Sequence, residues 1–327
     1  MEFPQDRRQR RSRFRRQPIG KQLCTSARDI EIFKLLRRYR YLPSNFIGAF
    51  VGGNPIRLKQ RLGDLYHEGY LDRPAQQWQM LNARYRHATY ELGKRGRRAL
   101  ERGGHVLGPA LASSGIFAHE AMVSLVIAAM ELGARDTPGT SFLSWETLCT
   151  EPTPTRSSNP APIPINLSHQ GRVLAFHLRP DGQPFAIAHR STDGRTRALY
   201  FPGVEIDRHT EPLASGDLHR SSMLRKILGY REIVATVAYR EHFGFSNMLV
   251  PILTVNAVHM EHIKGLILSL TNGKGASYLL LKTVPDFTHP NLAIQPDAAL
   301  FREPWERAGH PPIKLDNELR SEARSTY

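Results

Sequence analysis

Two continuous apolar stretches constrain the fold of this chain most. The segments "MLVPILTVN" (248–256) and "SYLLLKTV" (277–284) carry apolar side chains with little alternation, as strands buried on both faces do. Between them, residues 257–270 have the pattern of a helix. Two strands joined by a helical crossover are expected to be parallel. This part of the chain therefore predicts a parallel strand pair inside a covered sheet.

The elements upstream of this pair extend the same domain. A mostly apolar helix is expected near 117–134, and a second helix over about 218–242. Between these helices we expect three antiparallel strands, at 172–178, 184–190 and 197–207, with an Asp-Gly turn before the last. The predicted fold class is α+β or α/β, with a mixed central sheet flanked by helices.

The N-terminal part has a different organisation, with short helices and a basic hairpin. The third helix, in "NPIRLKQRLGDLYHEGYL", has clear end signals: Asn54 as cap, Pro55 at its first position and Gly69 beyond its end. The segments "YLDR" and "HATYEL" read as two strands around a basic loop, and "GKRGRRALERGG" as a closing basic helix. This order predicts a winged helix-turn-helix, whose third helix enters the major groove of DNA.

Charge supports a nucleic-acid partner. The 45 Lys and Arg against 30 Asp and Glu give a net charge of +15 and a pI near 10.1. The run "RRQRRSRFRR" from residue 7 to 16 has almost nothing to bury, and we expect a disordered arm that contacts phosphates. The predicted DNA-binding residues are Arg57, Gln60 and Arg61 of the third helix, Arg84 and Arg86 of the wing, and Arg10 and Arg11 of the arm.

These patterns give five predicted segments and a predicted location. They are a basic arm (1–24), a winged helix domain (25–103), a linker (104–115), an α/β domain (116–285) and a C-terminal extension (286–327).

Cys24 and Cys149 are the only cysteines, which excludes a disulfide framework and a Cys-rich zinc module and fits a reducing cytoplasm. The longest apolar stretch is about half of the ~20 residues that a membrane span needs.

Acidic residues suggest chemistry in the second domain. In "GVEIDRHTEP", Glu205 and Asp207 are two residues apart on a strand, so both side chains project from one face. Asp181 lies in the turn "RPDG", and Glu120 near the start of the apolar helix. Carboxylates are ligands that Mg²⁺ or Mn²⁺ takes together with waters and substrate phosphates. We therefore predict Glu120, Asp181 and Glu205 as metal ligands.

At these residues the sequence resembles the PD-(D/E)xK nuclease superfamily. More narrowly, the winged helix, "HE" at 119–120, "RPD", "VEIDRHTEP", "RKILGY" and "PILTVN" together resemble the bacterial replication-relaxation family of plasmids and mobile elements. The resemblance covers nearly the whole chain from about residue 25. It implies a DNA-binding domain fused to a nuclease-like domain, in a cytoplasmic bacterial protein that acts in replication or relaxation of mobile DNA.

One departure from the nuclease pattern affects the chemistry. The pattern Glu-x-Lys has Asp207 where the lysine is expected. Lys226, in the following helix, could reach back to the carboxylates, with Tyr230 one turn further on the same face. The predicted catalytic residues are Asp181, Glu205, Asp207 and Lys226, for a metal-dependent endonuclease or nicking activity.

Alternatives remain open from the sequence. The protein could be a non-catalytic winged-helix accessory factor or transcriptional regulator with a degenerate nuclease fold, or an assembly protein that only holds nucleic acid. Arg208 and Arg225 could pair with the acids in a structural network. The predicted partner is double-stranded DNA, with a second copy of the chain and replication or conjugation proteins as further partners. His259 and His262, in "HMEH", read as a surface pair.

Overall fold

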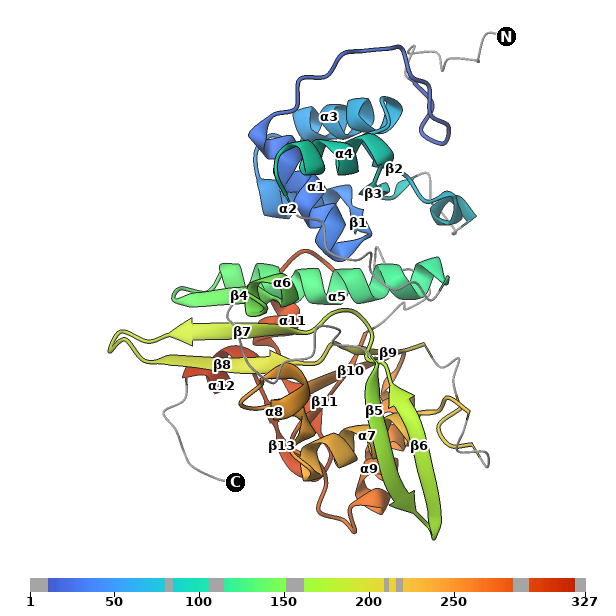
Figure 1. Ribbon diagram of the computed structural model, residues 1–327, viewed down its shortest axis with the longest axis vertical. Coiled ribbons are helices and arrows are strands. Elements are labelled where there is room, and N and C mark those ends of the chain that lie inside the picture. The colour runs from blue at the N-terminus through green and yellow to red at the C-terminus, as the bar shows by residue number, and fades with distance from the viewer. Residues whose placement is uncertain are drawn as a thin grey trace. The chain divides into compact units, whose positions relative to one another are not determined.

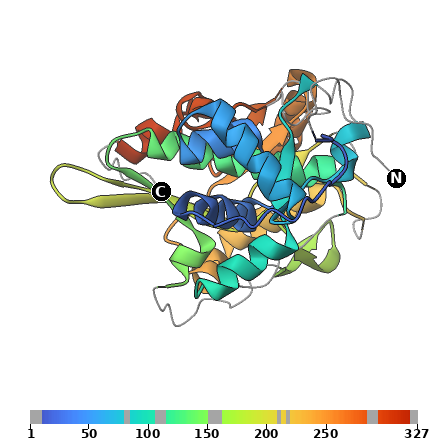
Figure 2. The same ribbon diagram turned by 90° about the horizontal axis from the view of Figure 1, so that it is seen from above.

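A computed structural model describes residues 11–79, 85–105, 115–150, 162–208, 212–215, 220–284 and 294–320 (Figures 1 and 2). The chain divides into two compact units. The first comprises Met1–Ala128 and His289–Pro296, and the second Ala129–Thr288 and Asp297–Tyr327. The boundary falls inside one long helix, α5 (Phe117–Arg135).

The first unit combines short helices with a small antiparallel sheet of strand order β1-β3-β2. Its elements before α5 are α1 (Ala27–Tyr39), β1 (Leu42–Pro43), α2 (Ser44–Val51), α3 (Pro55–His67), β2 (Leu71–Asp72), a 3-10 turn (Ala75–Gln79), β3 (Thr89–Leu92) and α4 (Lys94–Arg102). The two predicted strands pair through Leu71 and Leu92. The strand β1, which the sequence did not predict, adds a third strand against β3.

Helix α3 begins and ends where its sequence signals predict. The Asn54 side chain accepts hydrogen bonds from the backbone N–H of Ile56 and of Arg57, both at 3.0 Å, and Pro55 occupies the first turn. Past the helix end, Gly69 has a φ of +81°, a conformation that favours glycine. The leucines predicted to share one face, Leu58, Leu62 and Leu65, are buried.

Residues 11–26 contain no helix or strand, but they are not a detached arm. The Arg16 guanidinium donates to the carbonyl oxygens of Tyr66 and Leu71, both at 3.0 Å. Asp64 of α3 accepts from Arg11 and, at 2.8 Å, from Lys21. These residues therefore have carboxylate and carbonyl partners in the first unit that composition alone does not reveal, while the expected disorder of the arm stays a prediction.

The described part of the second unit contains a five-stranded mixed sheet, as predicted, and two smaller antiparallel sheets. Its remaining elements are β4 (Thr140–Ser144), α6 (Trp145–Leu148), β5 (Ile163–His169), β6 (Arg172–Leu178), β7 (Phe185–Arg190), β8 (Thr196–Phe201), β9 (Glu205–Asp207), α7 (Met223–Ala235), α8 (Ala238–Phe243), β10 (Val250–Thr254), α9 (Ala257–Leu270), β11 (Leu279–Thr283), α11 (Ala299–Arg302), β12 (Trp305–Arg307), β13 (His310–Ile313) and α12 (Leu315–Arg320). The strand orders are β13-β12-β11-β10-β9, β4-β7-β8 and β5-β6.

The predicted parallel pair is the centre of the five-stranded sheet. Strands β10 and β11 run parallel, joined by the crossover helix α9, and β9 is parallel to β10 on its other side. Helices α7 and α9 lie beside this sheet in Figure 1, and Ile227 and Ile263 share a buried core cluster with Ile252 and Leu281. Burial of these aliphatic side chains stabilises the layer that holds the acidic residues.

The stretch 197–207, predicted as one strand, forms two strands in different sheets. Strand β8 pairs antiparallel with β7 in a long hairpin that extends to the left in both views (Figures 1 and 2). The chain then breaks at Pro202 and Gly203 before β9 joins β10. The predicted helix 218–242 is likewise two helices, because Val237 adopts a left-handed conformation with φ 55° between α7 and α8.

Residues beyond 285 contribute to the sheet as well as extending the chain. Strand β12 pairs antiparallel with β11 through Glu306 and Leu281, and Trp305 is fully buried.

Helix α5 is long and apolar enough to cross a membrane, but 72% of its apolar 18-residue window is buried within the protein. Such burial is typical of the core helix of a soluble protein.

Candidate functional site

Glu205 lies on β9 opposite Ile252 of β10 and is completely buried. Two side chains of α7 contact its carboxylate. The Tyr230 hydroxyl donates a hydrogen bond of 2.5 Å to Oε1, and Lys226 Nζ lies 2.9 Å from Oε2. Lys226 and Tyr230 are four residues apart, so helical geometry places both on the face that meets β9. The reach of Lys226 to Glu205, a prediction from the sequence, is present in the structure.

Asp181 is held beside β9 by the backbone. Its N–H and carbonyl exchange hydrogen bonds of 2.9 Å with Val204, and its Oδ2 accepts from the Ile206 N–H at 3.0 Å. Gly203 permits this close approach, since its φ is +147° and a Cβ there would lie 2.6 Å from the Asp181 carbonyl oxygen. The Pro-Asp turn and the Glu-x-Asp strand are therefore neighbours, as the sequence predicted.

The electrostatics of this cluster are those of two carboxylates near one cation. The pKa of Glu205 is raised to about 7, because burial, the largest cause, and the negative charge of Asp181 together outweigh the lowering by Lys226 and by the Tyr230 hydrogen bond. Burial, followed by the charge of Glu205, raises the pKa of Tyr230 well above its ordinary value. Tyr230 therefore remains a hydrogen-bond donor to Glu205 across the neutral range.

Two carboxylates of this cluster, Asp181 and Glu205, are the candidates for a divalent ion, which stays a prediction. Asp181 and Glu205 are near enough for the charge of one to raise the pKa of the other, a repulsion that a cation relieves. Within the described residues, no group of three or more His, Cys, Asp or Glu side chains has a geometry suited to a metal. An ion at Asp181 and Glu205 would therefore complete its shell with waters and substrate oxygens, as Mg²⁺ usually does.

Asp207 occupies the lysine position of the nuclease pattern. It has a histidine partner that was not predicted from the sequence. Asp207 Oδ2 lies 2.7 Å from His259 Nε2, and both side chains are at most 5% exposed. The interpretation of His259 as a surface residue is therefore wrong. Asn256 caps α9 by accepting from the His259 N–H at 2.8 Å, which sets His259 in the first turn after β10. His259 follows a strand, β10, that runs parallel to β9, which carries Asp207. This position in the chain is the sequence signal that could have identified the pair.

Glu120, the third predicted metal ligand, belongs to the first unit. Its Oε2 lies 3.3 Å from Arg40 Nη1, and its Oε1 accepts from the Gly115 N–H at 3.1 Å. Asp181 and Glu205 belong to the second unit. A metal-binding role for Glu120 stays a prediction.

Arg225 was considered from the sequence as a partner for the acids. Its guanidinium lies over the Phe176 ring, 4.3 Å from the ring centroid.

The predicted DNA-binding residues fall into two groups. Arg57 and Gln60 are exposed on α3. Arg61 instead donates through Nη2 to Asp29 at 2.6 Å and to the Cys24 carbonyl at 2.8 Å. Asp29 is 1% exposed, so this ion pair is part of the fold of the first unit.

The remaining predicted DNA-binding residues lie in the arm and the wing. Arg11 pairs with Asp64, and Arg86 is half-buried, with its carbonyl accepting from Arg13. Arg10 and Arg84 lie outside the described residues. Of the predicted residues that the structure describes, Arg57 and Gln60 are therefore the best placed to meet a partner.

Comparison with known proteins adds one finding at the level of the family. The family model described as replication-relaxation matches residues 33–249. The matched range runs from α1 to the end of the segment before β10 and includes Asp181, Glu205 and Lys226, but not His259. No curated protein and no solved structure matches the chain.

Proposed function

Because the chain belongs to the replication-relaxation family, we propose that it binds duplex DNA and acts on its backbone at Asp181, Glu205 and Lys226. The family assignment supports a role in replication or relaxation of mobile DNA. The observation that carries the chemical part is the contact of Lys226 with Glu205 at 2.9 Å. Lys226, from the following helix α7, thereby takes the place of the lysine that the strand motif lacks.

Each residue of this cluster has a distinct role in the proposed reaction. Asp181 and Glu205 would hold a Mg²⁺ or Mn²⁺ ion, which would lower the pKa of a water and stabilise the leaving oxygen of a phosphodiester. Lys226 neutralises one carboxylate and orients it. Tyr230 fixes the rotamer of Glu205 through its hydrogen bond. Asp207 and His259 are a positioning pair next to these ligands.

DNA recognition is proposed for the first unit, as a winged helix whose α3 enters the major groove. Exposed Arg57 and Gln60 have the side chains that pair bidentately with guanine and adenine edges. The net charge of +15 supports this partner, because phosphate contacts supply most of the affinity for DNA.

Duplex selection from a random library, followed by binding measurements, tests this recognition. Arg57→Ala should weaken binding to the selected site roughly tenfold or more, as loss of a bidentate base contact does. Lys34→Ala is the matched control, because it removes the same charge from a different helix, α1. Among the described residues, Lys34 forms an exposed ion pair with Glu31. Equal binding of the protein to selected and random duplexes would contradict sequence recognition and favour an arm that only holds nucleic acid.

A second function is favoured by the burial of Glu205. Its side chain is completely buried and both of its oxygens contact α7. A carboxylate sealed in this way suits a non-catalytic accessory factor or regulator that kept the nuclease-like arrangement for its fold. This function predicts site-specific DNA binding with supercoiled plasmid left intact in Mg²⁺ and in Mn²⁺. The first function predicts relaxed or linear plasmid under the same conditions.

A further inference from the structure

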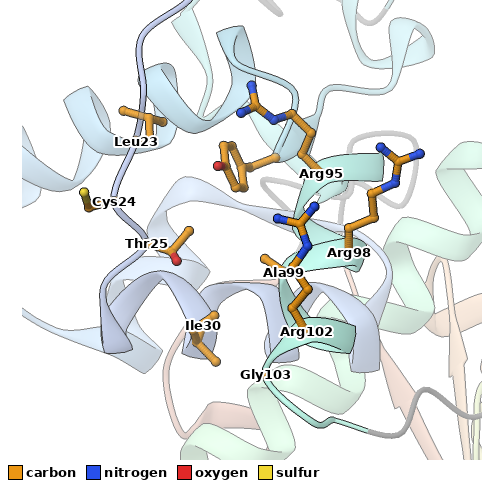
Figure 3. A pocket seen from close by; sticks show the side chains of 10 residues that line it. Leu23, Cys24, Thr25, Ile30, Arg95, Arg98, Ala99, Arg102 and Gly103 are labelled. Atoms are coloured by element: carbon orange, nitrogen blue, oxygen red, sulfur yellow. The ribbon is translucent and has the colours of Figure 1, made fainter.

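A cavity of about 540 Å³ lies in the first unit between the segment 23–25 and helix α4 (Figure 3). Three arginines of α4, Arg95, Arg98 and Arg102, line it together with Thr25 and Tyr70. The volume is within the range of about 300–1,000 Å³ that small-molecule sites have. None of these residues belongs to the exposed face of α3 or to the acidic cluster of the second unit.

The three arginines share one face of α4 because they are separated by three and four residues. Figure 3 shows their side chains rising from the same side of the helix. Among the described residues, none of the three has a carboxylate within ion-pair distance. Solvent screens these exposed charges, and Arg95 also contacts a carbonyl and a ring, but no carboxylate balances them within the described part of the chain.

Helix stability explains the charge of Arg102, which lies in the last turn of α4 and suits the helix dipole, but not the charge at the start of the helix. Lys94 and Arg95 occupy the first turn of α4, where no acidic residue is present. Cations there oppose the helix dipole, which favours negative charge at the N-terminus. A bound anion would offset both the dipole and the repulsion between the arginines.

The walls of the cavity are held in place by other contacts. Arg95 donates to the Glu68 carbonyl at 2.9 Å and lies over the Tyr70 ring at 4.7 Å. On the opposite wall, the Cys24 carbonyl accepts from Arg61 at 2.8 Å. Next to it, Ser26 and Asp29 form the capping box of α1. These contacts fix Arg95 and the backbone of the opposite wall, whereas Arg98 and Arg102 are exposed side chains that a ligand would have to order.

We propose that this cavity binds a phosphate group through Arg98 and Arg102, with Arg95 and Thr25 as further donors. Guanidinium groups form charge-assisted, bidentate hydrogen bonds with phosphate oxygens. The phosphate belongs either to a free phosphorylated small molecule or to the backbone of a nucleic-acid strand. The site does not depend on base recognition by α3 or on metal chemistry in the second unit.

Calorimetric titration with pyrophosphate and with a short random-sequence duplex tests the site at fixed ionic strength. Arg98→Ala should weaken binding of the true ligand roughly tenfold, by loss of a charged hydrogen bond. Arg97→Ala is the matched control, because Arg97 is an exposed arginine of the same helix that does not line the cavity. Thermal melts should be alike for both variants, whose side chains are exposed.

The alkylation rate of Cys24 reports whether the anion occupies the cavity, because the Cys24 thiol is exposed and lines it. In a Cys149→Ser background, the ligand should slow alkylation of Cys24, and Arg98→Ala should remove this protection while Arg97→Ala keeps it. Protection by pyrophosphate identifies a small-molecule site, and protection by the duplex alone identifies a backbone contact. The proposal is overturned if neither probe binds, or if Arg97→Ala weakens binding as much as Arg98→Ala.

Discussion

Lys226→Ala is expected to lower the free energy of unfolding by about 3–5 kcal/mol at pH 8, as removal of one partner of a buried ion pair does. Glu205 is completely buried, so without the lysine its charge has no cation to balance it. At pH 5 the loss should be much smaller. Urea unfolding of the metal-free protein at the two pH values measures the difference.

The dependence on pH follows from the pKa of Glu205, which is raised to about 7. Because this value exceeds that of a glutamate in the unfolded chain, the native state binds the proton more tightly. The stability gained from that proton is present at low pH and is lost as pH rises through about 7. Lys226 limits the loss by stabilising the ionised form, so its removal matters most above pH 7.

Lys264→Ala is the control for this prediction. Lys264 pairs with Glu261 at 3.0 Å on helix α9, and the Glu261 side chain is 60% exposed. A surface pair of this kind contributes about 0–1 kcal/mol, with little change between pH 5 and 8. Equal losses in the two variants, or a loss from Lys226→Ala that does not change with pH, would show that Lys226 does not serve the buried carboxylate.

Glu205→Gln is expected to reduce nicking of supercoiled plasmid in Mg²⁺ or Mn²⁺ by at least about a hundredfold. Loss of a metal ligand removes several kcal/mol of charge stabilisation from the reaction. The substitution keeps the shape of the side chain and an oxygen to accept from Tyr230, but it leaves Lys226 without its counter-charge. Cleavage is therefore compared at a temperature where thermal melts show both proteins to be folded. Duplex binding by the first unit should be unchanged.

Glu261→Gln provides the matched comparison for cleavage, since it makes the same chemical change at an exposed position of α9. This variant should cleave like the unaltered protein. Full activity of Glu205→Gln would remove Glu205 from the mechanism. Plasmid left intact by the unaltered protein in both metals would leave the non-catalytic function as the better account.

The sequence predicted the elements with strong local signals. Helix α3 has its cap at Asn54 and its left-handed glycine at Gly69, both of which act through neighbouring backbone groups. The apolar strands β10 and β11 and their crossover helix were predicted from composition and length alone. The proximity of Asp181 to β9 followed from the order of the strands that carry them.

What the sequence did not predict depends on contacts between distant segments. The break at Pro202 and Gly203 has a local signal, the Pro-Gly dipeptide, but the close approach of the Asp181 backbone to Gly203 comes from a distant segment. The docking of residues 11–26 depends on Asp64 and on carbonyl groups of the first unit. His259 meets Asp207 only because the ends of β9 and β10 are adjacent. Arg61 matched a recognition residue by its helical position, yet Asp29 engages it.

The most direct test of the metal site is a Mn²⁺ titration of the unaltered protein and of Asp181→Asn, followed by calorimetry. If Asp181 and Glu205 share an ion, the unaltered protein should bind Mn²⁺ with one site per chain, and the variant should bind at least about tenfold more weakly. Equal affinity in the two proteins, or no binding to the unaltered one, would contradict a metal-dependent site at these carboxylates.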